Sequence, residues 1–192
     1  MTSVGLQRLG SVSSESGPLL LVDVFSVKGW GGSGSGDYQR ICAWLDDHPS
    51  VPGYQVDLGT GLALVWELGG AGTADVYRRT AQDLLLIRSW ADADLHASEA
   101  AGLPPLDSLS RLGGLTVTSG FVLAFWPPAA GHEIDVPSVL ADGVQVEVSG
   151  VSDAGLIVAL SAGRYSAYWD EVFSATTEAR RCWLVKEDAP IP

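Results

Sequence analysis

Short apolar runs bounded by glycine recur along the whole chain, and they limit the fold more than any other feature of the sequence. The runs are rich in Leu and Val and are too short for long buried helices, a pattern typical of buried β-strands between turns. They predict strands at residues 17–27, 53–58, 61–68, 83–90, 116–126, 143–148, 155–160, 164–169 and 180–186. The sequence therefore predicts a mainly β protein.

One segment has the spacing of a helix instead. Tyr38, Ile41 and Leu45 recur at helical intervals after Asp37, a residue type that caps helix N-termini, and His48-Pro49 ends the segment. The glycine-rich stretch KGWGGSGSG precedes this aspartate. It lacks the Gly-Lys-Ser/Thr of a phosphate-binding loop, and a carboxylate at the helix start would repel phosphate. We expect a glycine turn into an Asp-capped helix.

These elements predict an α+β fold, mainly antiparallel β, with one short helix near residues 38–46. Pro104-Pro105 and Gly113-Gly114 mark a boundary, which gives a β-rich half at 15–96, a linker at 97–114 and a β-rich half at 115–188, closely packed on the first. GLALVWELGG aligns with GLIVALSAGR, and DLLLIRSWADAD with TEARRCWLVKED. Two interpretations stay open, an internal repeat or a shared strand-and-turn pattern. Sandwich and barrel are equally open.

The charge balance points to the kind of partner. The chain has 23 acidic residues against 11 Lys and Arg, a formal net charge of −12. Such a balance disfavours nucleic acid and favours a cationic partner, although acidity can also serve solubility alone. The N-terminus lacks the apolar region of a signal peptide, and no apolar run approaches the roughly 20 residues of a membrane span. We expect a cytoplasmic protein with no membrane partner, in which Cys42 and Cys182 are free buried thiols.

No pattern of residues predicts catalysis with any strength. GxSxG is absent, and no cofactor motif occurs. One alternative is a metal site at Asp92, Asp94 and His96, whose donors at alternate positions would share one face of an extended strand. A solvated strand end explains the same residues. We therefore expect a protein that is not an enzyme and has no cofactor.

The chain contains seven tryptophans, a residue type enriched both in cores and at interface hot spots. Six of them lie in or beside apolar runs, which favours the core. Trp169 is followed directly by Asp170 and Glu171, and it is the best candidate for an exposed anchor.

Several motifs, taken in order, resemble the bacterial immunity protein 21 family. They are GPLLLV, Trp30-Gly31-Gly32, Gly36-Asp37-Tyr38 with Arg40 and Cys42, GLALV, and LLLIRSW followed by ADAD. The likeness covers about residues 15–96, and the second half shares only Gly163-Arg164-Tyr165. Pro104-Pro105 and the stretch from Tyr168 to Glu171 depart from it.

Members of that family are encoded beside polymorphic toxins, so the resemblance implies a cytoplasmic antitoxin that binds and occludes a cognate toxin domain. Acidic side chains would then attract a cationic toxin, and a few aromatics would supply the buried contact. The candidate partner-binding residues are Trp169, Asp170, Glu171, Asp92 and Asp94. Two alternatives remain: a metal-dependent enzyme or ligand-binding β-sandwich that uses Asp92, Asp94 and His96, and a module that binds another host protein.

Overall fold

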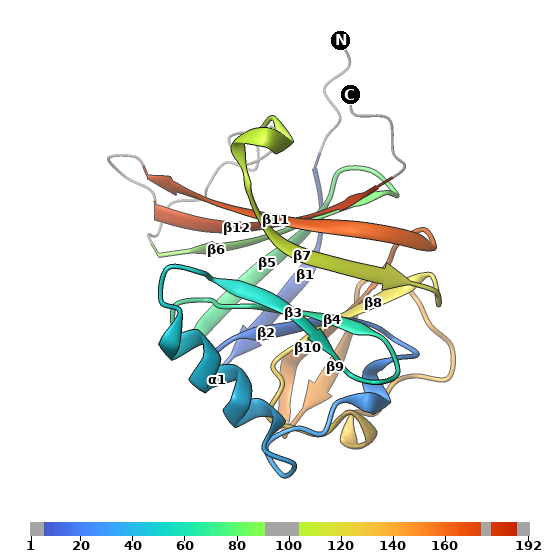
Figure 1. Ribbon diagram of the computed structural model, residues 1–192. Helices are drawn as coiled ribbons and strands as arrows, with labels where there is room; N and C mark the ends of the chain where they lie inside the picture. Colours follow the sequence, from blue (N-terminus) through green and yellow to red (C-terminus); the bar gives the residue numbers. More distant parts are fainter. Residues whose placement is uncertain (1–5, 91–103, 174–177, 188–192) are drawn as a thin grey trace.

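Two six-stranded antiparallel sheets lie face to face in the computed structural model, which describes residues 6–90, 104–173 and 178–187 (Figure 1). Sheet A contains, in spatial order, β1 (Gln7–Ser14), β5 (Gly72–Arg78), β6 (Asp83–Ser89), β12 (Glu178–Lys186), β11 (Gly163–Phe173) and β7 (Ser110–Val117). Sheet B contains β3 (Gly53–Asp57), β4 (Leu62–Trp66), β2 (Leu19–Asp23), β8 (Phe121–Phe125), β10 (Val151–Ala159) and β9 (Val144–Val148). Among the described residues no ladder joins the two sheets, so the fold is a sandwich. The predicted mainly antiparallel β fold is confirmed.

In the described ranges, a single α-helix accompanies the sheets. Helix α1 (Asp37–Asp47) agrees with the predicted helix within a residue at each end, and it lies against sheet B (Figure 1). There the rings of Trp44 and of Tyr54 in β3 pack at a tilt, with centres 4.0 Å apart. Three short 3-10 helices complete the described elements: η1 (Val27–Gly29), η2 (Leu106–Ser108) and η3 (Gly131–Glu133). The described part of the chain contains no helix long and apolar enough to span a lipid bilayer.

The core fills the space between the sheets. Every residue of β2 is buried, and most of β4, β8 and β10 is buried as well. This explains the continuous Leu and Val runs, because a strand covered on both faces cannot alternate with polar residues. Both cysteines are free, as predicted; Cys182 is buried and Cys42 is half-buried.

The two halves of the chain interleave in both sheets. Read outward from the centre, sheet A runs β6-β5-β1 on one side and β12-β11-β7 on the other, and sheet B runs β2-β4-β3 and β8-β10-β9. Each strand of the first half thus has a counterpart six strands later, at the mirrored position. The aligned sequences pair β4 with β10 and β6 with β12, which are the same counterparts. The interpretation as two similar halves therefore holds for the strand order, and the halves share one sandwich.

A stronger trace of the repeat lies in the first strand of each half. Arg8-Leu9-Gly10 in β1 and Arg111-Leu112-Gly113 in β7 have the same sequence. Both strands carry a register shift at the leucine, which has no partner on the neighbouring strand. Each strand ends in a turn to sheet B at Ser-Gly, where Gly17 and Gly120 adopt φ of +76° and +78°. These matching irregularities support an internal repeat more directly than the apolar runs do.

The sandwich edges are closed by equivalent side chains. Gln55 of β3 accepts a hydrogen bond from the Gly114 N–H of β7 at 2.9 Å, and Gln145 of β9 donates one to the Ser11 carbonyl oxygen of β1 at 2.9 Å. An unpaired edge is a site of unwanted strand pairing. Each glutamine ties the outer strand of one sheet to the outer strand of the other.

Some predicted boundaries differ from the structure. Residues 116–126 form the end of β7 and all of β8, which are separated by the turn at Ser119-Gly120. Strand β7 begins at Ser110, within the residues predicted as linker. Strands β1 and β5 were not predicted, because they bury only some of their residues and contain no apolar run.

The glycine-rich stretch is an ordered turn into α1. Gly36, with φ of +82°, is the N-cap, so the predicted cap at Asp37 is wrong by one residue. The Asp37 carboxylate instead accepts the Gly31 N–H at 2.9 Å and pairs with Arg40 in the first turn of the helix. Trp30 is buried, and its indole N–H donates to the Pro127 carbonyl oxygen at 2.8 Å. The turn therefore docks the helix onto the loop that follows β8.

Candidate partner-binding site

The predicted anchor residues lie at the end of β11, where they pair with arginines of β12. The Asp170 carboxylate accepts the Arg181 Nε–H at 2.7 Å, and Glu171 accepts Arg180 Nη2–H at 2.7 Å. Trp169 is half-buried and packs against the main core. The two acids are therefore already neutralised within the chain. Asp92 and Asp94, the other predicted anchors, and His96 of the metal alternative lie outside the described residues.

The exposed aromatics at this end are Trp90 and Phe173. Their exposed fractions are 40% and 67%. Trp90 was predicted to lie in the core because it follows the apolar run of β6. Its backbone N–H donates to the Glu178 carbonyl oxygen at 3.0 Å, which holds it beside the start of β12.

Two arginines flank these rings. The guanidinium carbon of Arg180 lies 5.7 Å from the Trp90 ring centre and 6.0 Å from that of Trp169, and the guanidinium carbon of Arg88 lies 5.4 Å from the Trp90 ring centre. Both distances from Trp90 fall within the range of cation–π attraction. We call Trp90, Trp169, Phe173, Arg88 and Arg180 the Trp90 patch.

Strand periodicity explains why arginines gather here. In β6, Leu84 and Leu86 face the main core, and Arg88 continues the same face at the end of the strand. Arg180 stands in the same relation to Cys182 of β12. The arginines thus emerge where the sandwich opens. Arg180 Nη1 crosses to sheet B and donates to the carbonyl oxygen of Glu67, just after β4, at 2.9 Å.

Arg88 differs from Arg180 in its electrostatic surroundings. Arg180 has Glu171, whereas Arg88 forms no ion pair with any described residue. Burial lowers the pKa of the Arg88 guanidinium, because partial removal from water disfavours its charge. Among the described residues, the Trp90 patch therefore holds one neutralised positive charge and one without a counter-charge.

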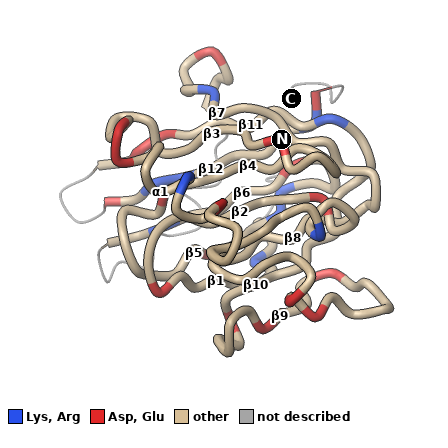
Figure 2. Tube along the Cα trace, turned by 60° about the horizontal axis from the view of Figure 1, so that its bottom comes forward, with Lys and Arg blue, Asp and Glu red and all other residues tan. Residues whose placement is uncertain are grey.

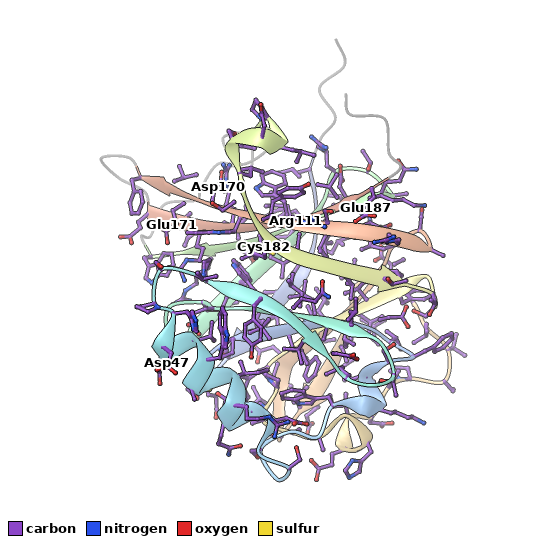
Figure 3. The ribbon with its side chains drawn as sticks, viewed as in Figure 1. Asp47, Arg111, Asp170, Glu171, Cys182 and Glu187 are labelled. Carbon is purple, nitrogen blue, oxygen red and sulfur yellow. The ribbon has the colours of Figure 1, made fainter. Side chains whose placement is uncertain are left out.

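Four acidic residues lie beside the patch or at the end of helix α1. Asp46 and Asp47 end the helix, Glu67 follows β4 and Glu178 begins β12, and none of them forms an ion pair within the described ranges. The Glu67 N–H bonds to Pro52, which follows Asp47 by five residues. Figure 3 shows Asp47 and Glu171 on the same side of the molecule. We call Asp46, Asp47, Glu67 and Glu178 the acidic rim.

The Trp90 patch includes two of the exposed large apolar residues of the described ranges. Five large hydrophobic residues are exposed in the described ranges, namely Phe25, Val51, Trp90, Val139 and Phe173. Trp90 and Phe173 belong to the patch. Val51 precedes Pro52, whose carbonyl oxygen accepts a hydrogen bond from the Glu67 N–H of the acidic rim. An apolar and aromatic centre with a charged border is the usual anatomy of a protein–protein interface.

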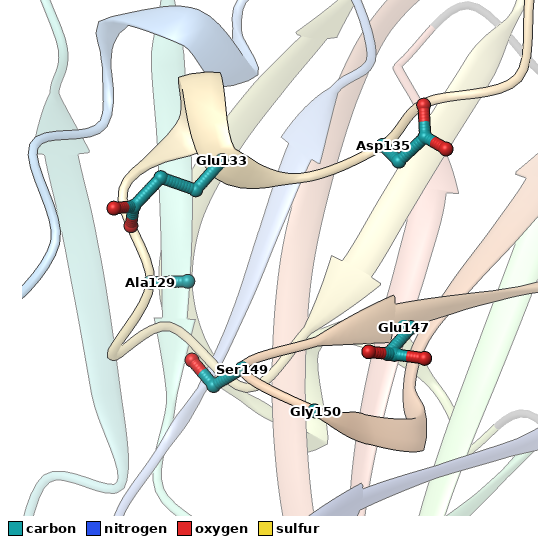
Figure 4. Close-up of a pocket in the computed structure, with 6 residues that line it drawn as sticks. All are labelled: Ala129, Glu133, Asp135, Glu147, Ser149 and Gly150. Carbon is teal, nitrogen blue, oxygen red and sulfur yellow. The ribbon is translucent and has the colours of Figure 1, made fainter.

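A second acidic surface lies around β9. Figure 2 shows several acids along this part of the molecule. A pocket of about 520 Å³ lies here, and Figure 4 shows Glu133, Asp135 and Glu147 at its border. The Glu133 carboxylate accepts the Ala130 N–H at 2.8 Å, and the three carboxylates do not converge on one point in the close-up. Across the described ranges, no three His, Cys, Asp or Glu residues are grouped closely enough to hold a metal ion.

Comparisons with models of known protein families, with curated proteins and with solved structures found no match.

Proposed function

We propose that this protein is a cytoplasmic immunity protein that binds a cationic toxin domain and neutralises it by occlusion. The observation that carries the proposal is the Trp90 patch with the acidic rim on its helix α1 side. An exposed tryptophan stacked with arginines is the composition of an interface hot spot. The resemblance of residues 15–96 to the immunity protein 21 family supports the same conclusion from the sequence.

Electrostatics supports a cationic partner. Eight of the nine arginines of the chain form ion pairs with acids of the same chain, so most of the positive charge is already compensated. The acids outnumber the Lys and Arg residues, which gives the net charge of −12. Uncompensated acids around an apolar centre would speed the approach of a positively charged protein and discourage acidic ones.

The proposed binding surface differs from the one that the sequence predicts. Asp170 and Glu171 hold Arg181 and Arg180, so their role is to position the arginines rather than to meet the toxin. Trp90 and Phe173 take the role proposed for Trp169. Asp92 follows Trp90 by two residues in the sequence and keeps its place as a candidate contact.

The proposal is tested by affinity purification of the tagged protein from its own host at moderate salt, with mass spectrometry of the bound fraction. It predicts one stoichiometric partner whose isolated terminal domain stops growth when expressed alone, and growth restored by coexpression of this protein. A bound partner that is harmless, or a toxic one whose effect coexpression does not relieve, would contradict it. An excess of a host enzyme would favour the regulatory alternative.

A further inference from the structure

Arg88 is the exception among the arginines of the chain. All nine lie in the described ranges, and the other eight each have a carboxylate within 4.0 Å. Arg88 has none among the described residues, although the chain carries 23 acids. A partly buried guanidinium without a counter-charge loses hydration and gains no Coulomb attraction in return.

The side chain of Arg88 is held in one place. Its Nη2 donates to the Ala71 carbonyl oxygen at 2.8 Å, and its buried Nε has no partner among the described residues. The guanidinium lies across Gly72, where an added Cβ would fall 1.5 Å from Nη1. A charge that is fixed before binding costs little further conformational entropy when a ligand arrives.

The position of Arg88 places this charge beside the exposed aromatic of the patch. The side chain is half-buried, and its guanidinium carbon lies 5.4 Å from the ring centre of Trp90. A ligand that covers the ring of Trp90 would also cover Arg88 and remove more water from it. Such a ligand would bind more tightly if it brought a carboxylate of its own.

We infer that the Trp90 patch binds a partner segment that presents a carboxylate to Arg88, next to an apolar side chain that packs on Trp90. The inference rests on the proposed function and adds the chemistry of the docking segment. The patch holds the positive charge of Arg88, and the acidic rim of Asp46, Asp47, Glu67 and Glu178 lies on its helix α1 side. The complementary partner surface is cationic with one acidic group near its centre.

A purely structural role makes a different prediction. If Arg88 serves only to hold the start of β5 through Ala71, its replacement lowers stability without any effect on the charge preference of a ligand. Selectivity between an acid and its uncharged amide is therefore the deciding readout, because a loss of folding cannot imitate it.

The experiment uses random peptides displayed on phage, selected on the full-length immobilised protein and counter-selected on Trp90→Ala. The best peptide and its analogue with each Asp or Glu changed to the amide are then titrated by tryptophan fluorescence. We expect enrichment of Asp or Glu beside apolar residues, and binding of the acidic peptide about tenfold tighter than its amide analogue. Enrichment of Lys and Arg, no enrichment that depends on Trp90, or equal affinities would overturn the inference.

Three variants complete the test. Arg88→Gln should abolish the preference for the acid, Arg88→Lys should keep part of it, and Arg8→Gln should keep all of it. Arg8 is a matched control, because its ion pair with Asp75 lies on the β1 and β5 pair and the change in net charge is the same. If circular dichroism shows that Arg88→Gln does not fold, the affinities of the acidic peptide and its amide analogue are compared on the wild type and on Arg88→Lys instead. A retained preference in folded Arg88→Gln would refute the inference.

The peptide experiment does not require the toxin. Acid selectivity without a toxic partner would retain the carboxylate site and reject immunity. A confirmed toxin with no acid selectivity would retain immunity and reject the carboxylate site.

Discussion

Asp23 is the buried group whose replacement tests the packing of the two halves most sharply. The residue ends β2, is 0% exposed and forms no ion pair with a described residue. Its carboxylate accepts the backbone N–H groups of Thr118 at 2.7 Å, Ser119 at 2.8 Å and Phe25 at 2.9 Å, and the Ser119 hydroxyl at 2.9 Å. One side chain of the first half thus fixes the turn between β7 and β8 in the second half.

The expected cost follows from the donors left behind. Asp23→Ala removes the acceptor from three backbone N–H groups, and each such loss costs about 1–3 kcal/mol when water does not replace the acceptor. These donors are only partly buried, so we take the lower part of the range and expect a loss of about 3–5 kcal/mol in the free energy of unfolding. Asp23→Asn keeps one acceptor oxygen and the shape of the side chain, and we expect about 1–3 kcal/mol.

The measurement is equilibrium unfolding in urea, followed by tryptophan fluorescence and circular dichroism at neutral pH. Both variants should shift the midpoint while the slope with denaturant stays that of the wild type. The reasoning is refuted if Asp23→Ala lies within about 1 kcal/mol of the wild type, or if Asp23→Asn is the more damaging of the two.

Three further predictions concern pH, backbone and thiol chemistry. Hydrogen bonds from Arg78 lower the pKa of Asp142 below its ordinary 3.8, so the pair stabilises the fold above that pH and this stabilisation is lost as the pH falls. Asp142→Asn should therefore lower the free energy of unfolding in urea by about 1–3 kcal/mol at pH 7 and by little at pH 2. An equal loss at both pH values would contradict this prediction. Gly120→Ala should lower the free energy of unfolding by about 1–2 kcal/mol, because Gly120 has a positive φ. Gly17→Ala should lower it by more, because the new methyl group would also lie 2.7 Å from the Tyr38 hydroxyl. Calorimetry that ranks the two variants in the opposite order would refute this prediction. Burial raises the pKa of the Cys182 thiol, so a thiol reagent at pH 8 should modify it only after denaturation, and rapid labelling of native protein would speak against the buried position.

The central strands could be predicted from the sequence because burial on both faces produces continuous apolar runs. Strands β1 and β5 could not, because their pattern resembles that of a polar loop. The apolar runs are weak evidence of the repeat, because buried strands of unrelated β proteins share the same pattern. It is clearer in Arg-Leu-Gly, the motif that produces the same register shift in β1 and β7.

The binding site depended on strand register, which a single sequence does not fix. Asp170 lies opposite Arg181, and Glu171 lies opposite Arg180, so the acids predicted as anchors are paired. Trp90 follows an apolar run, and the signal that it leaves the core is Arg88, which breaks that run two residues earlier. The sequence alone identified neighbouring residues such as Trp169 as candidates, but it did not predict how exposed their side chains are.

The most direct measurement of the central claim compares two phenylalanines of equal exposure. Phe173 in the Trp90 patch is 67% exposed, and Phe25 outside it is 69% exposed. Isothermal titration of the purified toxin domain should show that Phe173→Ala weakens binding by about tenfold or more, while Phe25→Ala leaves the dissociation constant unchanged. Equal affinities for both variants, or a loss confined to Phe25→Ala, would contradict the assignment of the Trp90 patch as the surface that neutralises the toxin.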